Sequence, residues 1–119
     1  MRGKELGAAG EEAAAQFLQN KGYQILARGY RNRVGEIDII AIARESLVFV
    51  EVKSRSGLGY GHPSEAVTVA KQRRILRMAE CYLQQTKQWN QPCRFDVIEV
   101  LLDEKNRLEV HHIINAFIS

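Results

Sequence analysis

Residues 35–53 read GEIDIIAIARESLVFVEVK. Two runs of bulky and β-branched side chains, 35–42 and 47–53, are separated by the short polar segment 43–46. Runs of this composition predict strands that are buried on both faces, and the short polar connection predicts a hairpin. A charged side chain inside such a hairpin needs a partner, a cleft or a metal ion, because burying an unpaired charge costs several kcal/mol.

Four charged side chains interrupt this hairpin, and their register can be counted. A turn centred on the middle of residues 43–46 places Asp38 opposite Glu51. The same register places Glu36 opposite Lys53, with all four side chains on one face. Directly opposed Cβ atoms lie roughly 4.5–5.5 Å apart. In this register Glu36 and Lys53 can form an ion pair, whereas Asp38 and Glu51 repel each other.

A hard divalent cation would turn that repulsion into attraction, because Mg²⁺ takes oxygen ligands and commonly rests on one or two carboxylates. Lys53 lies two residues beyond Glu51, so its ammonium would point into the same site and could orient a water or offset charge on a phosphoryl oxygen. Asp38, Glu51 and Lys53 therefore predict a metal-dependent site for phosphodiester hydrolysis. The alternative is a structural ion-pair network at a solvated edge of the sheet.

Short motifs along the whole chain resemble one known family. They are Gly10-Glu11, Gly22-Tyr23, Gly35-Glu36-Ile37-Asp38, Phe49-Val50-Glu51-Val52-Lys53, Gly61-His62-Pro63, Arg94-Phe95-Asp96 and Asn115-Ala116-Phe117. In these motifs the chain resembles the PD-(D/E)XK nuclease superfamily. It resembles most closely the YraN-type family of predicted bacterial endonucleases, which is related to archaeal Holliday-junction resolvases.

The resemblance implies an α/β fold, with a single restriction-endonuclease-like domain over residues 1–119. Its αβββαβ core would contain a mixed central sheet flanked by helices. The resemblance also implies that Asp38 and Glu51 bind Mg²⁺, with Mn²⁺ as a substitute, and that Lys53 is catalytic. A helical glutamate at the position of Glu11 often completes such a site. Turnover does not follow from the fold, because function resides in the site.

Composition sets the bounds of the interpretation. The chain has 119 residues, 45% of them hydrophobic and 26% charged, which is typical of one compact soluble domain. No apolar run approaches the roughly 20 residues of a membrane-spanning helix, and the polar N-terminus is unlike a signal peptide. We therefore expect a cytoplasmic protein with no membrane partner. The spacing of Cys81 and Cys93 predicts free thiols, and the histidines lack the spacing of a zinc site.

Residues 4–21 predict a helix that ends at Gly22. Glu11 falls on the apolar stripe of this helix and should face the sheet, whereas Glu12 falls on its polar side. Glu11 is therefore a candidate auxiliary metal ligand. The alternative is that Glu11 caps or pairs locally in the first turns, where the helix dipole favours acidic side chains.

A second helix is predicted from a cap at Ser64 to about Gln88. The segment 54–63 before it holds three glycines, which predict a loop that either closes over a substrate or is a plain connection. Residues 64–91 contain five Lys or Arg and two Glu. The net charge of this segment, five minus two, equals the formal net charge of +3 of the whole chain. This basic face predicts contacts with phosphate backbones; the alternative is a solvated helix face.

The candidate nucleic-acid contacts are Arg31, Arg33, Arg55, Lys71 and Arg74. Closing strands are predicted over residues 95–101 and 108–114. In the first of them, Asp96 is expected to be a structural partner for a nearby Arg or Lys.

These observations favour a metal-dependent endonuclease that hydrolyses DNA, with branched DNA as a candidate substrate. Asp38 and Glu51 would bind the metal with help from Glu11, Lys53 would position the water, and Glu36 would orient Lys53. A homodimer would bring two such sites to one substrate, although no sequence feature marks its interface.

Two other functions stay open. The first is a nucleic-acid-binding module that cleaves nothing and acts as an adaptor in DNA repair or uptake. The second is a structural or protein-interaction role in which the charged hairpin faces a partner protein. Salt-sensitive DNA binding without a metal requirement would indicate the first, and absence of DNA binding at low salt would indicate the second.

Overall fold

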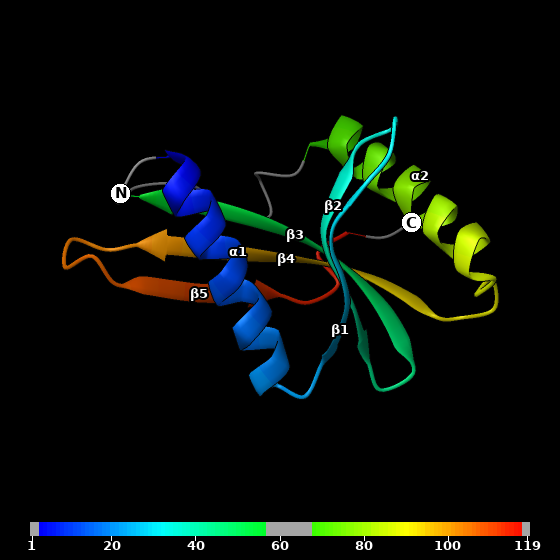
Figure 1. Cartoon of the computed structure of the whole chain (residues 1–119), viewed down its shortest axis with the longest axis horizontal. Coiled ribbons are helices and arrows are strands. Elements are labelled where there is room, and N and C mark those ends of the chain that lie inside the picture. Colours follow the sequence, from blue (N-terminus) through cyan, green and yellow to red (C-terminus); the bar gives the residue numbers. More distant parts are fainter. Residues whose placement is uncertain (1–2, 57–67, 118–119) are drawn as a thin grey trace.

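The computed structural model describes residues 3–56 and 68–117. Within them the chain forms, in order, α1 (Gly3–Asn20), β1 (Gln24–Arg31), β2 (Glu36–Ala43), β3 (Ser46–Ser56), α2 (Val69–Thr86), β4 (Cys93–Leu102) and β5 (Leu108–Ile113). These strands form one sheet in the order β1-β2-β3-β4-β5, with β3 and β4 parallel and the other neighbours antiparallel. The predicted α/β fold with a mixed sheet flanked by helices is confirmed (Figure 1).

Two apolar clusters hold the helices against the two faces of the sheet. The cluster under α1, which lies across β3, β4 and β5 in Figure 1, contains Leu18, Val50 and Ile98. The cluster under α2 contains Phe49 and Met78. Because Phe49 and Val50 are neighbours on β3 and point to opposite faces, this strand is buried on both sides, as its composition predicts.

The hairpin of β2 and β3 has the register counted from the sequence. Ile39 pairs with Val50, and Ala43 pairs with Ser46 across the turn. At the end away from the turn, the ladder stops at the pair of Ile39 and Val50. Asp38, the neighbour of Ile39 on β2, lies just outside it. The carboxylate of Asp38 therefore lies at the open end of the hairpin rather than between two continuous strands.

The predicted ion pair between Glu36 and Lys53 is wrong. Beyond the end of the β2–β3 ladder, β2 pairs only with β1, where Glu36 lies opposite Arg31. The side chain of Glu36 accepts hydrogen bonds from Arg31, with the Nη2 atom 2.7 Å from Oε2. The strands diverge at this point, so counting register from the turn fails there.

β2 turns over at Asp38: the side chains of the residues before and after Asp38 point to opposite faces of the sheet. Residues two apart on a regular strand share a face, yet Ile37 packs in the cluster under α2 and Ile39 in the cluster under α1. The matching position on β1 is Gly29, which has a left-handed backbone with φ of +64°. Glycine adopts this conformation without steric cost. As a result, the Asp38 side chain borders both sides of the sheet.

α1 lies close to β3 at Gly10. A Cβ atom on this residue would lie 1.9 Å from Oγ and 3.0 Å from Cβ of Ser54, so a larger residue would push the helix away. Glycine allows this close approach. The next residue, Glu11, borders the same hollow as Asp38.

The boundaries of β3 and α2 differ from those predicted. β3 continues to Ser56, because parallel β4 supplies hydrogen-bonding partners for residues 54–56, which the glycine pattern predicts as loop. α2 begins at Val69 with Thr68 as its N-cap. The predicted cap at Ser64 and the remainder of the predicted loop lie outside the described residues.

Two other sequence predictions can be compared with the structure. Cys81 and Cys93 are free thiols, as predicted. The helix before Gly22 ends at Asn20, and Gly22 has a φ of +93°. Among the described helices, neither is long and apolar enough to cross a membrane.

Candidate functional site

Asp38 lies half-buried beside Glu51 at the end of the β2–β3 ladder. Its Oδ2 atom accepts a hydrogen bond from the backbone N–H of Val52 at 2.8 Å. Burial, followed by the negative charge of Glu51, raises the pKa of Asp38 to about 7 despite that hydrogen bond, and Glu11 and Glu36 add smaller repulsions. Three neighbouring carboxylates therefore repel the charge of Asp38, and a proton or a cation at Asp38 relieves this repulsion.

Glu51 is 8% exposed and has a cationic partner. The Nζ atom of Lys71, in the first turn of α2, lies 2.5 Å from Oε1 of Glu51. The charge count along the helix identified Lys71 as basic, but it could not find this partner. The position of α2 over β3 depends on the crossover between β3 and β4, which no local pattern encodes.

Among the residues that the structure describes, two hollows border Asp38, one towards α1 and one towards α2. The hollow towards α1 has a volume of about 300 Å³ and is lined by Gly3, Gly7, Glu11, Asp38, Val52, Lys53 and Ser54. The hollow towards α2 has a volume of about 200 Å³ and is lined by Glu36, Asp38, Glu51, Lys71, Arg74 and Ile75. Asp38 thus borders both hollows, whereas Lys53 is among the residues that line only the first and Glu51 is among those that line only the second.

The surroundings of Lys53 include a second buried carboxylate. Lys53 lies opposite Glu99 of β4 in the parallel register. Within the part of the chain that the structure describes, Oε2 of Glu99 accepts no hydrogen bond, and the Nε atom of Arg55 lies 3.5 Å from it. Sequence reasoning missed Glu99, although a charge inside the apolar run of β4 was a usable signal.

Glu11 is more buried than Glu12, as the helical spacing predicts. The Glu11 side chain is 27% exposed and borders the hollow that contains Asp38, whereas the Glu12 side chain is 54% exposed. Both approach Arg28 of β1, at 3.8 Å for Glu11 and 2.8 Å for Glu12. Glu12 is therefore the main partner of Arg28, and Glu11 keeps a carboxylate oriented towards Asp38.

The donor set of Asp38 and Glu51 suits a hard divalent cation, because it consists of oxygen atoms whose mutual repulsion a cation would remove. Over residues 3–56 and 68–117, however, no group of three or more His, Cys, Asp or Glu side chains is placed to hold a metal ion. The two carboxylates could therefore hold Mg²⁺ only with water or phosphate oxygens completing its coordination. Glu11 does not form a ready-made third ligand.

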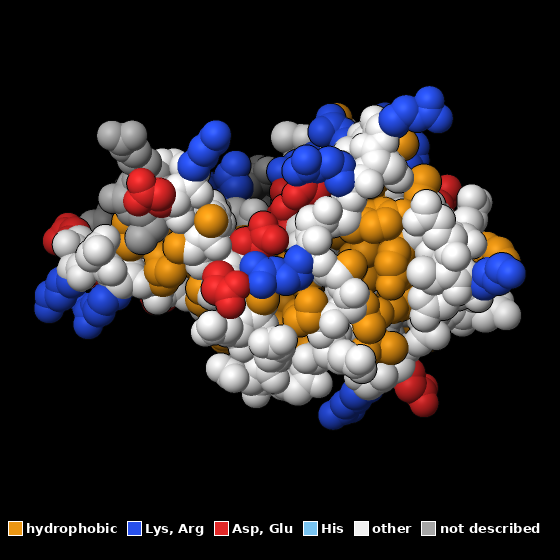
Figure 2. Space-filling model, in the orientation of Figure 1, with side chains coloured by type: hydrophobic (Ala, Val, Ile, Leu, Met, Phe, Trp, Pro, Cys, Tyr) orange, Lys and Arg blue, Asp and Glu red, His pale blue; other side chains and the backbone are white. Residues whose placement is uncertain are grey.

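The other predicted nucleic-acid contacts lie around this site. Arg31 pairs with a glutamate of β2, Arg33 is exposed in the β1–β2 connection, and Arg74 borders the hollow towards α2. Arg55 approaches the buried carboxylate on β4. Figure 2 shows acidic and basic side chains meeting in the middle of one face, beside α1. The site is therefore mixed in charge rather than uniformly basic.

Comparison with known proteins gives a consistent result. Residues 10–100 match the sequence model of "Uncharacterised protein family UPF0102". The chain belongs to the UPF0102 family. It is 54% identical to a UPF0102 protein of Symbiobacterium thermophilum, over 96% of this chain and 97% of that one. It is 49% identical to a UPF0102 protein of Caldicellulosiruptor saccharolyticus, over 98% and 100% of the two chains.

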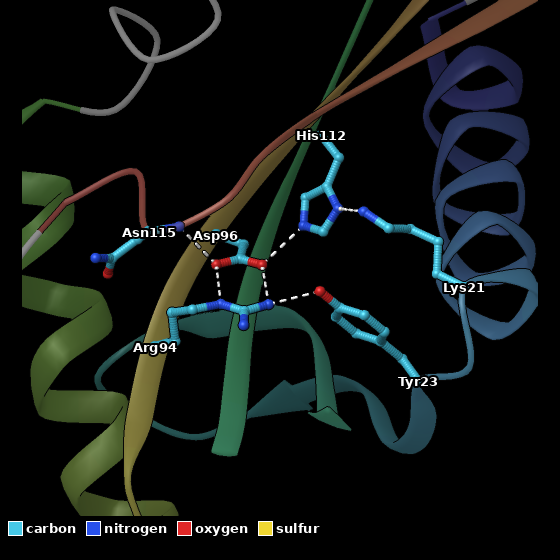
Figure 3. Close-up of polar contacts among 6 residues, drawn as sticks. All are labelled: Lys21, Tyr23, Arg94, Asp96, His112 and Asn115. Carbon is cyan, nitrogen blue, oxygen red and sulfur yellow. Dashed lines mark hydrogen bonds and ion pairs between the residues drawn. The ribbon is translucent and has the colours of Figure 1, made fainter. Parts of the chain in front are cut away.

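In this UPF0102 protein the predicted structural role of Asp96 is confirmed. The carboxylate of Asp96 is fully buried and accepts hydrogen bonds from Nε and Nη2 of Arg94, each at 2.9 Å (Figure 3). Nε2 of His112, at 2.7 Å, and the backbone N–H of Asn115, at 2.9 Å, bind the same carboxylate. Burial alone would raise the pKa of Asp96, but these hydrogen bonds hold that pKa below its usual value.

Proposed function

We propose that this protein is a divalent-metal-dependent nuclease of the PD-(D/E)XK type that hydrolyses DNA phosphodiester bonds, with branched DNA as a candidate substrate. The observation that supports this function most directly is the placement of Asp38. It lies beside Glu51 at the open end of an apolar hairpin, and it shares a hollow with Lys53. Two mutually repelling carboxylates with a lysine next to them are the groups that metal-assisted phosphodiester hydrolysis requires.

Each side chain has a role in this proposal. Asp38 and Glu51 would hold Mg²⁺ or Mn²⁺, and a bound cation of this kind supplies a more acidic water and offsets charge on the phosphate. Lys53, which borders the same hollow as Asp38, donates hydrogen bonds to the attacking water or to a phosphate oxygen. Glu11, in the same hollow, accepts a hydrogen bond from a water and so orients it.

Glu36 is a positioning residue in a different sense from the one the sequence suggests. It pairs with Arg31 and therefore cannot orient Lys53. It instead adds negative charge next to Asp38, which is one cause of the raised pKa of that carboxyl group. Glu36 thus favours the binding of a cation at Asp38 without touching the reacting atoms.

The experiment that tests this function compares cleavage by the wild type with cleavage by two site variants. Purified protein is incubated with end-labelled linear and four-way-branched DNA, in Mg²⁺, in Mn²⁺ and in chelator. We expect metal-dependent cleavage by the wild type and a loss of at least about a hundredfold in Asp38→Asn and Lys53→Ala.

Matched control variants separate the site from general charge effects. Glu109→Gln removes an exposed carboxylate from β5, and Lys105→Ala removes an exposed ammonium from the β4–β5 turn. Both controls should cleave like the wild type. Cleavage that is equal in the wild type and in all variants would come from a contaminating nuclease and would contradict the proposal.

A second candidate function is a nucleic-acid-binding module without catalysis. The contact between Lys71 and Glu51 favours it, because this ammonium already neutralises one of the two proposed metal ligands. Such a module would bind DNA equally well in Mg²⁺ and in chelator, with affinity falling as salt rises. Metal-independent binding together with no cleavage under any condition would establish this function in place of the first.

A further inference from the structure

A separate basic pocket lies at the turn end of the β2–β3 hairpin. It has a volume of about 340 Å³ and is lined by Lys21, Gly22, Tyr23, Ala43, Arg44 and Arg94. Along β2, Ala43 is five residues from Asp38, a separation of roughly 16 Å at the usual rise of a strand. The pocket is therefore distinct from the acidic site formed around Asp38 and Glu51. Its lining contains three cationic side chains and no carboxylate.

Arg94 is fixed in place by groups behind the pocket wall. Its two hydrogen bonds to Asp96 form a bidentate pair, and Asp96 is further bound by His112 and Asn115 (Figure 3). The carboxylate thus has its acceptor positions occupied by the protein. The bonds to Asp96 use Nε and Nη2 of Arg94, which leaves Nη1 able to donate to a further acceptor.

Tyr23 and Lys21 are also held in place by hydrogen bonds, and each keeps at least one hydrogen-bond donor for a ligand. The hydroxyl oxygen of Tyr23 accepts a hydrogen bond from Nη2 of Arg94 at 2.6 Å, so its own O–H can donate elsewhere. The Nζ atom of Lys21 lies 2.9 Å from Nδ1 of His112. Because an ammonium only donates, Nδ1 of His112 accepts this bond, and two further N–H groups of Lys21 remain.

Arg44 completes the pocket from the hairpin turn. Its backbone is left-handed, with φ of +58°, a conformation that usually selects glycine or asparagine. Arg44 is exposed, and the structure shows no carboxylate within ion-pair distance of it among residues 3–56 and 68–117. The turn therefore presents an arginine at the mouth of the pocket where the backbone favours a smaller residue.

We propose that this pocket binds a phosphate group. Arginine and lysine donors in fixed orientations, with a tyrosine hydroxyl beside them, suit the tetrahedral oxygens of phosphate, and a planar guanidinium can bind two of those oxygens at once. The same chemistry fits inorganic phosphate, a terminal phosphate of a nucleic-acid strand and a phosphodiester within one. The site is independent of catalysis at Asp38.

The test follows backbone amide NMR signals while phosphate is added to the Asp38→Asn protein in chelator, with chloride at equal ionic strength as the reference. This background lacks one of the two proposed metal ligands and the chelator removes the metal, so failure of the proposed nuclease activity cannot affect the result. We expect saturable shifts confined to the amides of the residues that line the pocket, with Gly22, Tyr23 and Arg44 among them. We also expect Arg44→Glu to weaken binding at least about tenfold, because charge-assisted hydrogen bonds are lost.

The matched control is Lys105→Glu, which reverses one exposed charge in the turn between β4 and β5 and should bind phosphate like its parent. Lys21→Ala gives a second variant with an expected loss in the same direction. Arg94 is left intact, because removing it would leave Asp96 buried and unpaired. Equal binding by Arg44→Glu and Lys105→Glu, or shifts that never saturate, would overturn the proposal.

Short oligonucleotides with and without a 5′-phosphate identify the source of the phosphate. Tighter binding of the phosphorylated strand assigns the pocket to a terminal phosphate, and equal binding of both, lost in Arg44→Glu, assigns it to the backbone. Inorganic phosphate binding without oligonucleotide binding assigns it to the free ion. No binding of any of the three probes would refute the site.

Discussion

The carboxyl group of Asp38 can be neutralised either by a proton or by a cation. With its pKa raised to about 7, the metal-free folded protein keeps a proton there that the unfolded chain releases near pH 4. Between these values the folded state binds more protons than the unfolded state. Its stability should therefore fall as the pH rises through this window.

Replacing Asp38 tests this charge directly. In chelator we expect Asp38→Asn to be more stable than the wild type by roughly 2–4 kcal/mol at about pH 8 and by much less at about pH 4. Asparagine keeps an oxygen that can accept the hydrogen bond from Val52. Urea unfolding across the pH range measures the difference. A gain of equal size at every pH, or an equal gain in the exposed control Glu109→Gln, would contradict the argument.

Asp96 should behave in the opposite way. Its pKa is lowered in the folded protein, so its contribution is fully present above about pH 4 and is lost as the pH falls through the lower, folded value. We expect Asp96→Ala to cost about 3–5 kcal/mol at neutral pH, because Arg94 and His112 lose a buried partner. Chemical unfolding of this variant against Asp103→Ala, in an exposed turn, provides the measurement; equal losses would be inconsistent with it.

At the scale of elements, the hairpin was predictable and its surroundings were not. The apolar runs and the short polar segment between them determine the pairing of Ile39 with Val50, because both signals are local. The partner of Glu36 was not predictable, since β2 turns over at Asp38 and continues along β1 alone. The contact of Lys71 with Glu51 depends on how α2 crosses the sheet, which strand and helix periodicity do not specify.

The close packing of α1 on β3 gives a prediction at this scale. Gly10→Ala places a methyl group against Ser54, and we expect a loss of about 1–3 kcal/mol in unfolding free energy. Gly7→Ala is the matched control, because a Cβ there meets nothing within 4 Å. It should be neutral or stabilise the helix by up to about 1 kcal/mol. Thermal unfolding of both variants measures the two changes in stability. Equal stability of Gly10→Ala and Gly7→Ala would show that α1 is free to shift.

The whole molecule places two sites of unlike charge at the two ends of one hairpin. The acidic site needs α1, the hairpin and α2, which supply Glu11, Asp38 and Lys71. The basic pocket needs the end of α1, the hairpin turn and the start of β4. Each site therefore depends on the assembled sheet, and residues 35–53 supply only part of each.

The contact between Lys71 and Glu51 gives a prediction at this scale, and it depends on the proposed metal site. A metal that binds Glu51 must displace the ammonium of Lys71, so we expect Lys71→Met to bind Mn²⁺ about tenfold more tightly than the wild type. Calorimetric titration measures the affinity, with Lys105→Met as the control for lost surface charge. Unchanged affinity in Lys71→Met would show that the ammonium and the ion do not compete.

The ammonium of Lys71 is part of the chain, so it neutralises Glu51 in the absence of a metal ion. The protein can therefore fold before it binds any metal. Metal binding then replaces Lys71 at Glu51, and the released ammonium needs another hydrogen-bond acceptor. A phosphate of an incoming strand is such an acceptor. Ion and strand would in that case bind cooperatively, since each favours the state in which Lys71 has left Glu51.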